Sequence, residues 1–184
     1  MTYARTVDRP AAVELVGPEL VRPLRHAVLR PGRPADESVY PGDDDAGSAH
    51  AAVRRPRGDV VVAVGTVLPS APWEAVAGDA GGPEGPAPGV PAWRIRGMAT
   101  AAGHRGGGLG TMVLGTLLAH VAAHGGGLVW CNARAGARAL YQRAGFAADG
   151  DAFDLPEIGP HVRMWRIVEG GGGGVGPTRP PVPT

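Results

Sequence analysis

A glycine-rich turn at residues 104–110 (HRGGGLG) is the part of the sequence best suited to chemistry. An apolar segment with helical spacing begins at Leu109, so the turn would present unpaired backbone N–H groups at the positive end of a helix dipole. Glycines let the backbone approach a ligand closely and adopt positive φ angles. Such a turn is suited to binding a diphosphate. The alternative is a flexible loop without function in a glycine-rich protein.

Two common phosphate-binding motifs do not fit this turn. A Walker loop requires Gly-Lys-Ser/Thr, but all 18 basic residues of the chain are Arg. A G-x-G-x-x-G fingerprint fails because Thr111 stands where its third glycine is required. The turn does match the pattern R-x-x-G-x-G, with Arg105, Gly108 and Gly110 at the fixed positions.

This R-x-x-G-x-G pattern resembles motif A of the GNAT superfamily of N-acetyltransferases. Members of that family commonly carry A-x-x-x-Y-x-x-x-G-F downstream, and the sequence has Ala137, Tyr141, Gly145 and Phe146 at this spacing. Two motifs separated by a helix and a strand are more specific than either one alone. The likeness covers residues 92–146 by motif and the remainder of the domain by the order of its elements.

The resemblance implies direct transfer of an acetyl group from acetyl-CoA to a primary amine in a ternary complex. Tyr141 matches the family's general acid, which protonates the departing thiolate. A phenol has a reference pKa of about 10 and a thiol about 8.5, so Tyr141 would be protonated at pH 7. The alternative is a core aromatic on a helix face. The residues implied to contact acetyl-CoA are Met98, Ala99, Arg105, Gly106, Gly107, Gly108, Leu109, Gly110, Thr111 and Asn132.

The same resemblance assigns a role to the strand before the turn. In this fold the fourth strand separates from the fifth, and the backbone at 97–99 would pair with the pantetheine arm like an added strand. The backbone N–H near Met98 would polarise the thioester. One departure is that Arg134 stands where many members have Asn, with Asn132 two residues earlier. Whether either side chain contacts the cofactor is left open.

A general base for the amine is harder to assign. His161 is the first candidate, because Gly159-Pro160-His161 resembles a step of the ElaA-like GNAT branch and imidazole titrates near neutrality. We expect this step in a loop between the last two strands, where His161 could instead make a structural hydrogen bond. His50 is the second candidate. The acidic run at 43–45 is interpreted as a solvated turn.

The elements that must position these residues follow from hydrophobic spacing and turn signals. We expect an α/β fold with a mixed, mostly antiparallel, twisted sheet, helices on both faces, and a cofactor cleft where the fourth and fifth strands splay apart. A single GNAT-like domain is predicted over 1–169, with a Gly/Pro-rich hairpin loop at 78–90 and a disordered tail at 170–184. Strands are predicted at 11–16, 48–54, 59–68, 92–99, 128–131, 146–153 and 161–168, and helices at 18–29, 109–124 and 135–144.

Composition limits the partners and the location. The net charge of +1 is spread along the chain, which argues against nucleic acid or an anionic membrane. No 18-residue apolar run and no apolar signal segment occur. The single cysteine, Cys131, has apolar neighbours, so we expect an inert buried thiol and a cytoplasmic location.

The acceptor is expected to be a small-molecule or peptide amine, with no metal cofactor. Scattered carboxylates give a weak indication of a cationic acceptor, and the resemblance allows a homodimer. Two other functions remain open: a non-catalytic acyl-CoA-binding or sensor domain, and a nucleotide-binding α/β module. The carboxylates are Asp43, Asp44, Asp45, Asp151, Asp154 and Glu157.

Overall fold

The computed structural model describes residues 12–55, 60–71, 89–156 and 158–171. Of the predicted hairpin loop at 78–90 and tail at 170–184, only residues 89–90 and 170–171 fall within this part. The elements are β1 (Val13–Val16), α1 (Pro18–Leu29), η1 (Ala35–Ser38), β2 (Ala49–Arg54), β3 (Val61–Pro69), β4 (Ala92–Thr100), η2 (Ala102–His104), α3 (Leu109–Ala123), β5 (Gly126–Arg134), η3 (Ala135–Ala137), α4 (Arg138–Arg143), β6 (Ala147–Leu155) and β7 (Gly159–Glu169).

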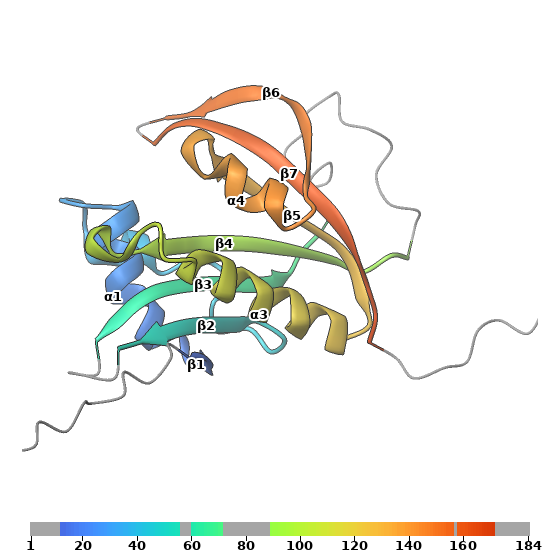
Figure 1. Ribbon diagram of the computed structural model, residues 1–184, viewed down its shortest axis with the longest axis horizontal. Helices are drawn as coiled ribbons and strands as arrows, with labels where there is room; N and C mark the ends of the chain where they lie inside the picture. The colour runs from blue at the N-terminus through green and yellow to red at the C-terminus, as the bar shows by residue number, and fades with distance from the viewer. Residues whose placement is uncertain (1–11, 56–59, 72–88, 157, 172–184) are drawn as a thin grey trace, which may run out of the picture.

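All seven strands form one sheet in the order β1-β2-β3-β4-β5-β7-β6. The β4–β5 pair is parallel and every other pair is antiparallel. Pairing between β4 and β5 extends only from Ala92↔Leu128 to Arg94↔Trp130, so the two strands separate toward their carboxyl ends (Figure 1). The predicted mixed, mostly antiparallel sheet with a splayed pair of strands is therefore confirmed.

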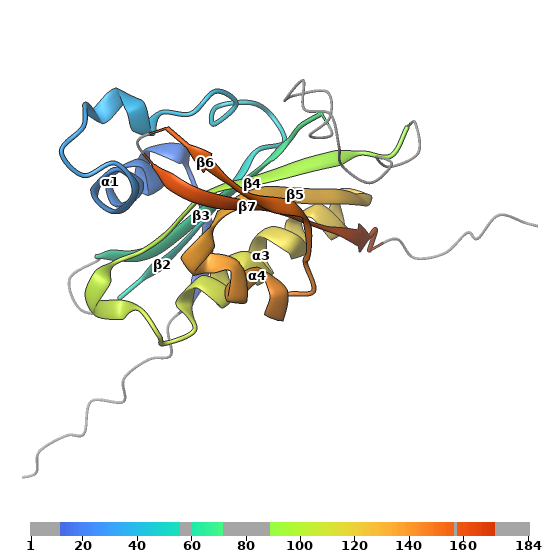
Figure 2. The ribbon, with the colours of Figure 1, turned by 90° about the horizontal axis from the view of Figure 1, so that it is seen from above.

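Helices cover both faces of the sheet, as predicted. Figure 2 shows α1 on one side of the strands and α3 with α4 on the other. Because side chains alternate along a strand, each strand divides its residues between these two faces. In β4, Trp93 and Ile95 belong to the core beneath α3, which places Arg94 and Arg96 on the α1 face.

The main core lies between the sheet and α3. This helix buries Val113, Leu114, Leu117 and Val121 completely, at a spacing that repeats along one helix face. Each such side chain contributes about 1.5–3 kcal/mol through burial. A smaller cluster around Val21 joins α1 to β2, β3 and β4. Among the described residues, no helix combines the length and the apolar character needed to cross a membrane.

Three predicted boundaries differ from the structure. Strand β5 was expected at 128–131 but runs from Gly126 to Arg134, because antiparallel pairing with β7 continues along its whole length. The Gly-Pro-His step was expected in a loop, yet β7 already begins at Gly159. The helix predicted at 135–144 divides into η3 and the shorter α4. Tertiary pairing, which local patterns do not contain, sets these limits.

Candidate active site

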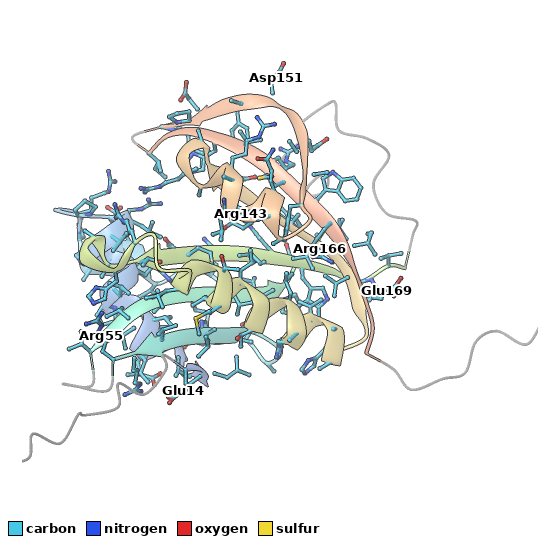
Figure 3. All side chains as sticks on the ribbon, viewed as in Figure 1. Glu14, Arg55, Arg143, Asp151, Arg166 and Glu169 are labelled. Atoms are coloured by element: carbon cyan, nitrogen blue, oxygen red, sulfur yellow. The ribbon has the colours of Figure 1, made fainter. Side chains whose placement is uncertain are left out.

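A cavity of about 910 Å³ occupies the space where β4 and β5 separate. Its lining comes from both faces of the sheet, with Leu109 and Leu140 from the α3 and α4 side and Val28 and Tyr40 from the α1 side. Arg143 on α4, which Figure 3 shows beside the gap between the two halves of the sheet, also lines it. The cavity therefore connects the two faces between the strands.

This cavity brings together most of the site residues expected from sequence. Tyr141 and His161 both line it, and so do nine of the ten residues expected to contact the cofactor. The exception is Gly107, which lies in the turn but not in the cavity wall. Asn132 contributes a buried side-chain oxygen, Oδ1, that has no hydrogen-bond partner in the described part of the chain. A ligand that donates a hydrogen bond would satisfy this oxygen.

The glycine turn leaves its backbone open at the start of α3. Gly106 and Gly108 have φ angles of +81° and +78°, which side-chain-bearing residues rarely adopt. The Gly108 carbonyl accepts the first helical hydrogen bond, from the Met112 N–H at 3.1 Å, so the preceding N–H groups lack helical partners. A Cβ on either glycine would meet no atom within 4 Å. These groups can therefore contact a diphosphate directly.

A bulge interrupts β4 next to the cavity. The β3 partners of Arg96 and Ala99 are Thr66 and Val64, so β4 holds one extra residue in this interval. Gly97 has a φ of +64°, and a Cβ there would lie 2.6 Å from Nε of Arg25. The position thus requires glycine for two separate reasons. Because a bulge removes backbone groups from regular pairing, it leaves part of this strand free to pair with a ligand.

Tyr141 is fixed by the way α4 ends. The Phe146 N–H donates to the Tyr141 carbonyl at 3.0 Å, and the Gly145 N–H donates to the Gln142 carbonyl at 2.9 Å. With Gly145 at a φ of +81°, this is a Schellman cap. Its apolar contact is the edge-on pair of Tyr141 and Phe146, whose ring centroids are 5.4 Å apart. The Y-x-x-x-G-F pattern is therefore a helix-ending motif that holds Tyr141 in place.

The environment of Tyr141 keeps its hydroxyl protonated. Burial, followed by the neighbouring Cys131 thiol, raises the pKa of Tyr141 well above its usual value of 10. Burial also raises the pKa of Cys131 to about 12, so this thiol is neutral near pH 7. Cys131 is 1% exposed, in agreement with the expected inert thiol. Of these two neighbours, Tyr141 lines the cavity and Cys131 does not.

His161 lies in β7 and has a defined tautomer. Its Nδ1 is 2.7 Å from the Gly159 carbonyl, which can only accept, so Nδ1 carries the proton. No hydrogen bond of the other ring nitrogen, Nε2, is found among the described residues, so this nitrogen of the neutral ring can accept a proton. The side chain is 5% exposed and lines the cavity beside Arg134, its register partner on the neighbouring strand β5. This arrangement suits a proton acceptor.

The second candidate, His50, has no free ring nitrogen. Its Nε2 donates to the Asp43 carbonyl at 2.8 Å, and its Nδ1 accepts from the Thr66 hydroxyl at 2.8 Å. The residue is buried and does not line the cavity. His50 therefore acts as a structural residue.

Asp43 is the exception to the interpretation of 43–45 as a solvated turn, since Asp44 and Asp45 are exposed. Its carboxylate is fully buried and pairs with the fully buried guanidinium of Arg25, at 2.5 Å between Oδ2 and Nη1. Arg25 also donates to the Ser38 carbonyl and to the Thr66 hydroxyl. The sequence carries a signal for this cluster, since Arg25 lies one helical turn after the apolar Val21 on α1. Within this cluster of Arg25, Asp43 and Thr66, the Arg25 side chain packs against the backbone of Gly97 and so supports the β4 bulge.

No group of three or more His, Cys, Asp or Glu residues that could hold a metal was found in the described ranges.

A mixed sheet whose two parallel strands separate beside a glycine turn is the arrangement that the resemblance to GNAT acetyltransferases implies. Residues 24–146 match the model of the acetyltransferase (GNAT) family, and the chain belongs to that family. The predicted resemblance is thereby confirmed. Members of this family transfer an acyl group from an acyl-CoA to an acceptor. As a member, the chain is an N-acetyltransferase.

Individual relatives agree with this assignment. The uncharacterized N-acetyltransferase YitI of Bacillus subtilis is 28% identical over 156 residues, which is 85% of this chain and 95% of that protein. The crystal structure of Escherichia coli ElaA has a TM-score of 0.62 at 18% identity and covers 84% of this chain and 99% of its own. The crystal structure of an acyl-CoA N-acyltransferase from Pseudomonas aeruginosa has a TM-score of 0.62 at 18% identity, and the match covers 85% of this chain and 99% of that one. These two structures share the fold.

Proposed function

We propose that the protein transfers an acetyl group from acetyl-CoA to a primary amine by direct attack in a ternary complex. The observation that carries the proposal is that the glycine turn, the β4 bulge, Tyr141 and His161 all line one cavity. The diphosphate would lie on the backbone of residues 106–111. Met98, Ala99 and Asn132 would line the path of the pantetheine arm.

The proposed proton transfers follow from the two titratable side chains. Acetyl-CoA supplies the thioester carbonyl and the thiolate leaving group. His161 Nε2 accepts the proton that the amine loses as its nitrogen forms the new C–N bond. The Tyr141 hydroxyl donates its proton to sulfur as the C–S bond breaks. Solvent then restores both groups to their starting protonation states.

A thiol-release assay with acetyl-CoA and a broad amine panel tests this function. We expect amine-dependent release of free CoA and, by mass spectrometry, an acetylated amine. Calorimetry addresses the two other functions. Tight acetyl-CoA binding without turnover of any amine would favour the sensor domain, whereas binding of ATP or NAD in its place would favour a nucleotide-binding module.

Gly108→Ala tests the role of the turn. The added methyl group meets no protein atom but lies where the diphosphate would approach, and the positive φ angle adds about 1–2 kcal/mol of strain. We expect the KM for acetyl-CoA to rise about tenfold or more. Steady-state kinetics with varied acetyl-CoA measures the change.

Gly115→Ala is the matched control, because it adds the same methyl group to an exposed position on α3 that has no atom within 4 Å and lies outside the cavity. We expect an unchanged KM and a gain in stability of up to about 1 kcal/mol. Equal KM values for both variants would exclude the turn as the diphosphate site.

The cytoplasmic location, the homodimer and the single domain over 1–169 stay predictions. Size-exclusion chromatography with light scattering tests the oligomeric state.

A further inference from the structure

Six arginines line the cavity without any described acidic residue in its wall, and four of them lie on the side that faces α1. Arg94 and Arg96 project from β4, Arg134 ends β5, and Arg30 follows α1. No Asp or Glu among the described residues lines the same cavity. The part of the cavity that faces α1 is therefore strongly cationic.

These arginines differ from those elsewhere in the fold. Within the described ranges, none of the four forms an ion pair, whereas five others do: Arg22, Arg25, Arg33, Arg54 and Arg163. The chain thus pairs its arginines with carboxylates at several places outside the cavity. Inside it, a negative charge must come from a bound molecule or from solvent ions.

Of these four arginines, Arg94 has the greatest need of a hydrogen-bond acceptor. Its guanidinium carbon lies 4.6 Å from the centre of the Trp130 ring, which fixes the plane of the group. Its Nε is buried without a hydrogen-bond partner in the part of the chain that the structure describes. Burial lowers the pKa of Arg94, which is the electrostatic sign of a cation held away from water. A buried donor without an acceptor is costly unless a ligand satisfies it.

Arg96 stands two residues further along the same face of β4. Its guanidinium carbon lies 4.1 Å from the centre of the Tyr40 ring, and Nη1 donates to the Pro41 carbonyl at 3.3 Å. Burial, and next the charge of Arg94, lowers the pKa of Arg96 to about 10, so it remains charged at pH 7. An anion close to both guanidinium groups would offset their mutual repulsion.

The phosphates of CoA are poorly placed to be this anion. Their proposed site is the turn at the start of α3, on the opposite face of the sheet from Arg94 and Arg96. Arg105 and Arg143 are the cavity arginines that come from the turn and from α4. We therefore expect an anion bound on the α1 face to be a group of the acceptor molecule.

We propose that the acceptor is an amine that carries a carboxylate, and that Arg94 and Arg96 bind this carboxylate. The inference rests on the proposed acetyl transfer. A planar guanidinium matches a carboxylate through two parallel hydrogen bonds, and each of these arginines is already oriented by an aromatic ring. Arg30 and Arg134 would add attraction for the incoming anion.

An acceptor that carries a carboxylate is the opposite of the cationic acceptor that the scattered carboxylates weakly indicated. Asp43 is paired with Arg25, and Asp44 with Arg22. Asp45 is exposed and does not line the cavity, and neither do Asp151 and Asp154, which are exposed on β6. Figure 3 shows Asp151 on the outer side of that strand. Glu157 lies outside the described residues.

Amino acids and their carboxamides provide the test, because each pair differs only in the charge beside the same amine. With acetyl-CoA and the wild-type protein, we expect kcat/KM for the best amino acid to exceed that of its carboxamide by about 10- to 100-fold. Arg94→Gln and Arg96→Gln should remove most of this preference by raising KM for the amino acid, with little change for the carboxamide. The KM for acetyl-CoA and the melting temperature should stay near wild-type values.

Arg55→Gln is the control, since Arg55 is exposed after β2 and does not line the cavity. It should keep the full preference. Equal rates with amino acids and carboxamides, or faster acetylation of diamines, would overturn the inference while leaving acetyl transfer intact. Faster transfer from succinyl-CoA to carboxamides would overturn it too, because the carboxylate would then belong to the acyl group. No thiol release with any amine would overturn the proposed function itself, and the inference with it.

Discussion

Tyr141→Phe is expected to lower kcat by about 10²- to 10⁴-fold, the usual contribution of a positioned acid or base. The change removes one hydroxyl and keeps the ring that packs against Phe146 at the end of α4. In the proposed mechanism, losing the hydroxyl removes the donor that stabilises the negative charge developing on sulfur. The KM values for acetyl-CoA and amine should change little, and steady-state kinetics of thiol release measures both parameters.

The pH profile provides a second measure of the same residue. Because burial raises the pKa of Tyr141 well above 10, its hydroxyl remains protonated up to at least pH 9.5. A raised pKa preserves the protonated donor at every lower pH and loses it only above the shifted value. We therefore expect no decline in kcat from Tyr141 ionisation between pH 7 and about 9.5.

Cys131→Ala separates the hydroxyl from its buried neighbour. The thiol, with its pKa near 12, is neutral as well, so it could in principle be the donor. We expect kcat within about threefold of wild type for this variant, since the thiol is not in the cavity wall. A large loss with Cys131→Ala, together with normal turnover by Tyr141→Phe, would assign the acid role to the thiol.

Arg25→Met is expected to destabilise the fold by about 3–5 kcal/mol, the usual result of removing one partner of a buried ion pair. Methionine fills much of the same volume but leaves the fully buried Asp43 carboxylate with the Tyr40 N–H, at 3.1 Å, and the more distant Arg22, at 3.8 Å. It also leaves the Thr66 hydroxyl without its donor from Arg25. Urea unfolding followed by circular dichroism gives the free energy difference.

The double variant Arg25→Met/Asp43→Leu separates the loss of the pair from the burial of an unpaired charge. Because it removes both charges, we expect it to recover a substantial part of the stability lost in Arg25→Met. Arg33→Met is the surface control, since its ion pair with Glu37 is exposed to solvent and should contribute little to stability. Similar losses for Arg25→Met and Arg33→Met would contradict a structural role for the buried pair.

The parts of the site that sequence predicted are those encoded by adjacent residues. The glycine turn is one loop, and its φ angles follow from its glycines. The segment from Tyr141 to Phe146 is one helix cap, closed by hydrogen bonds between residues at most five positions apart. The paired patterns also identified the family, and the order of the elements then gave the sheet.

The parts that sequence did not predict depend on residues that are distant in the chain. The Arg25–Thr66 hydrogen bond spans 41 positions and belongs to two elements with no shared pattern. The weak indication of a cationic acceptor came from counting carboxylates, because composition does not show that Asp43 and Asp44 are paired with arginines. A signal was nevertheless present, since Arg94 and Arg96 alternate with apolar residues on one buried strand.

A crystal structure of the protein with CoA would show where the cofactor binds. We expect diphosphate oxygens within about 3 Å of backbone N–H groups in residues 106–111, and the CoA sulfur within hydrogen-bonding reach of the Tyr141 hydroxyl. A diphosphate bound away from this turn, or a sulfur separated from Tyr141 by other side chains, would contradict this expectation.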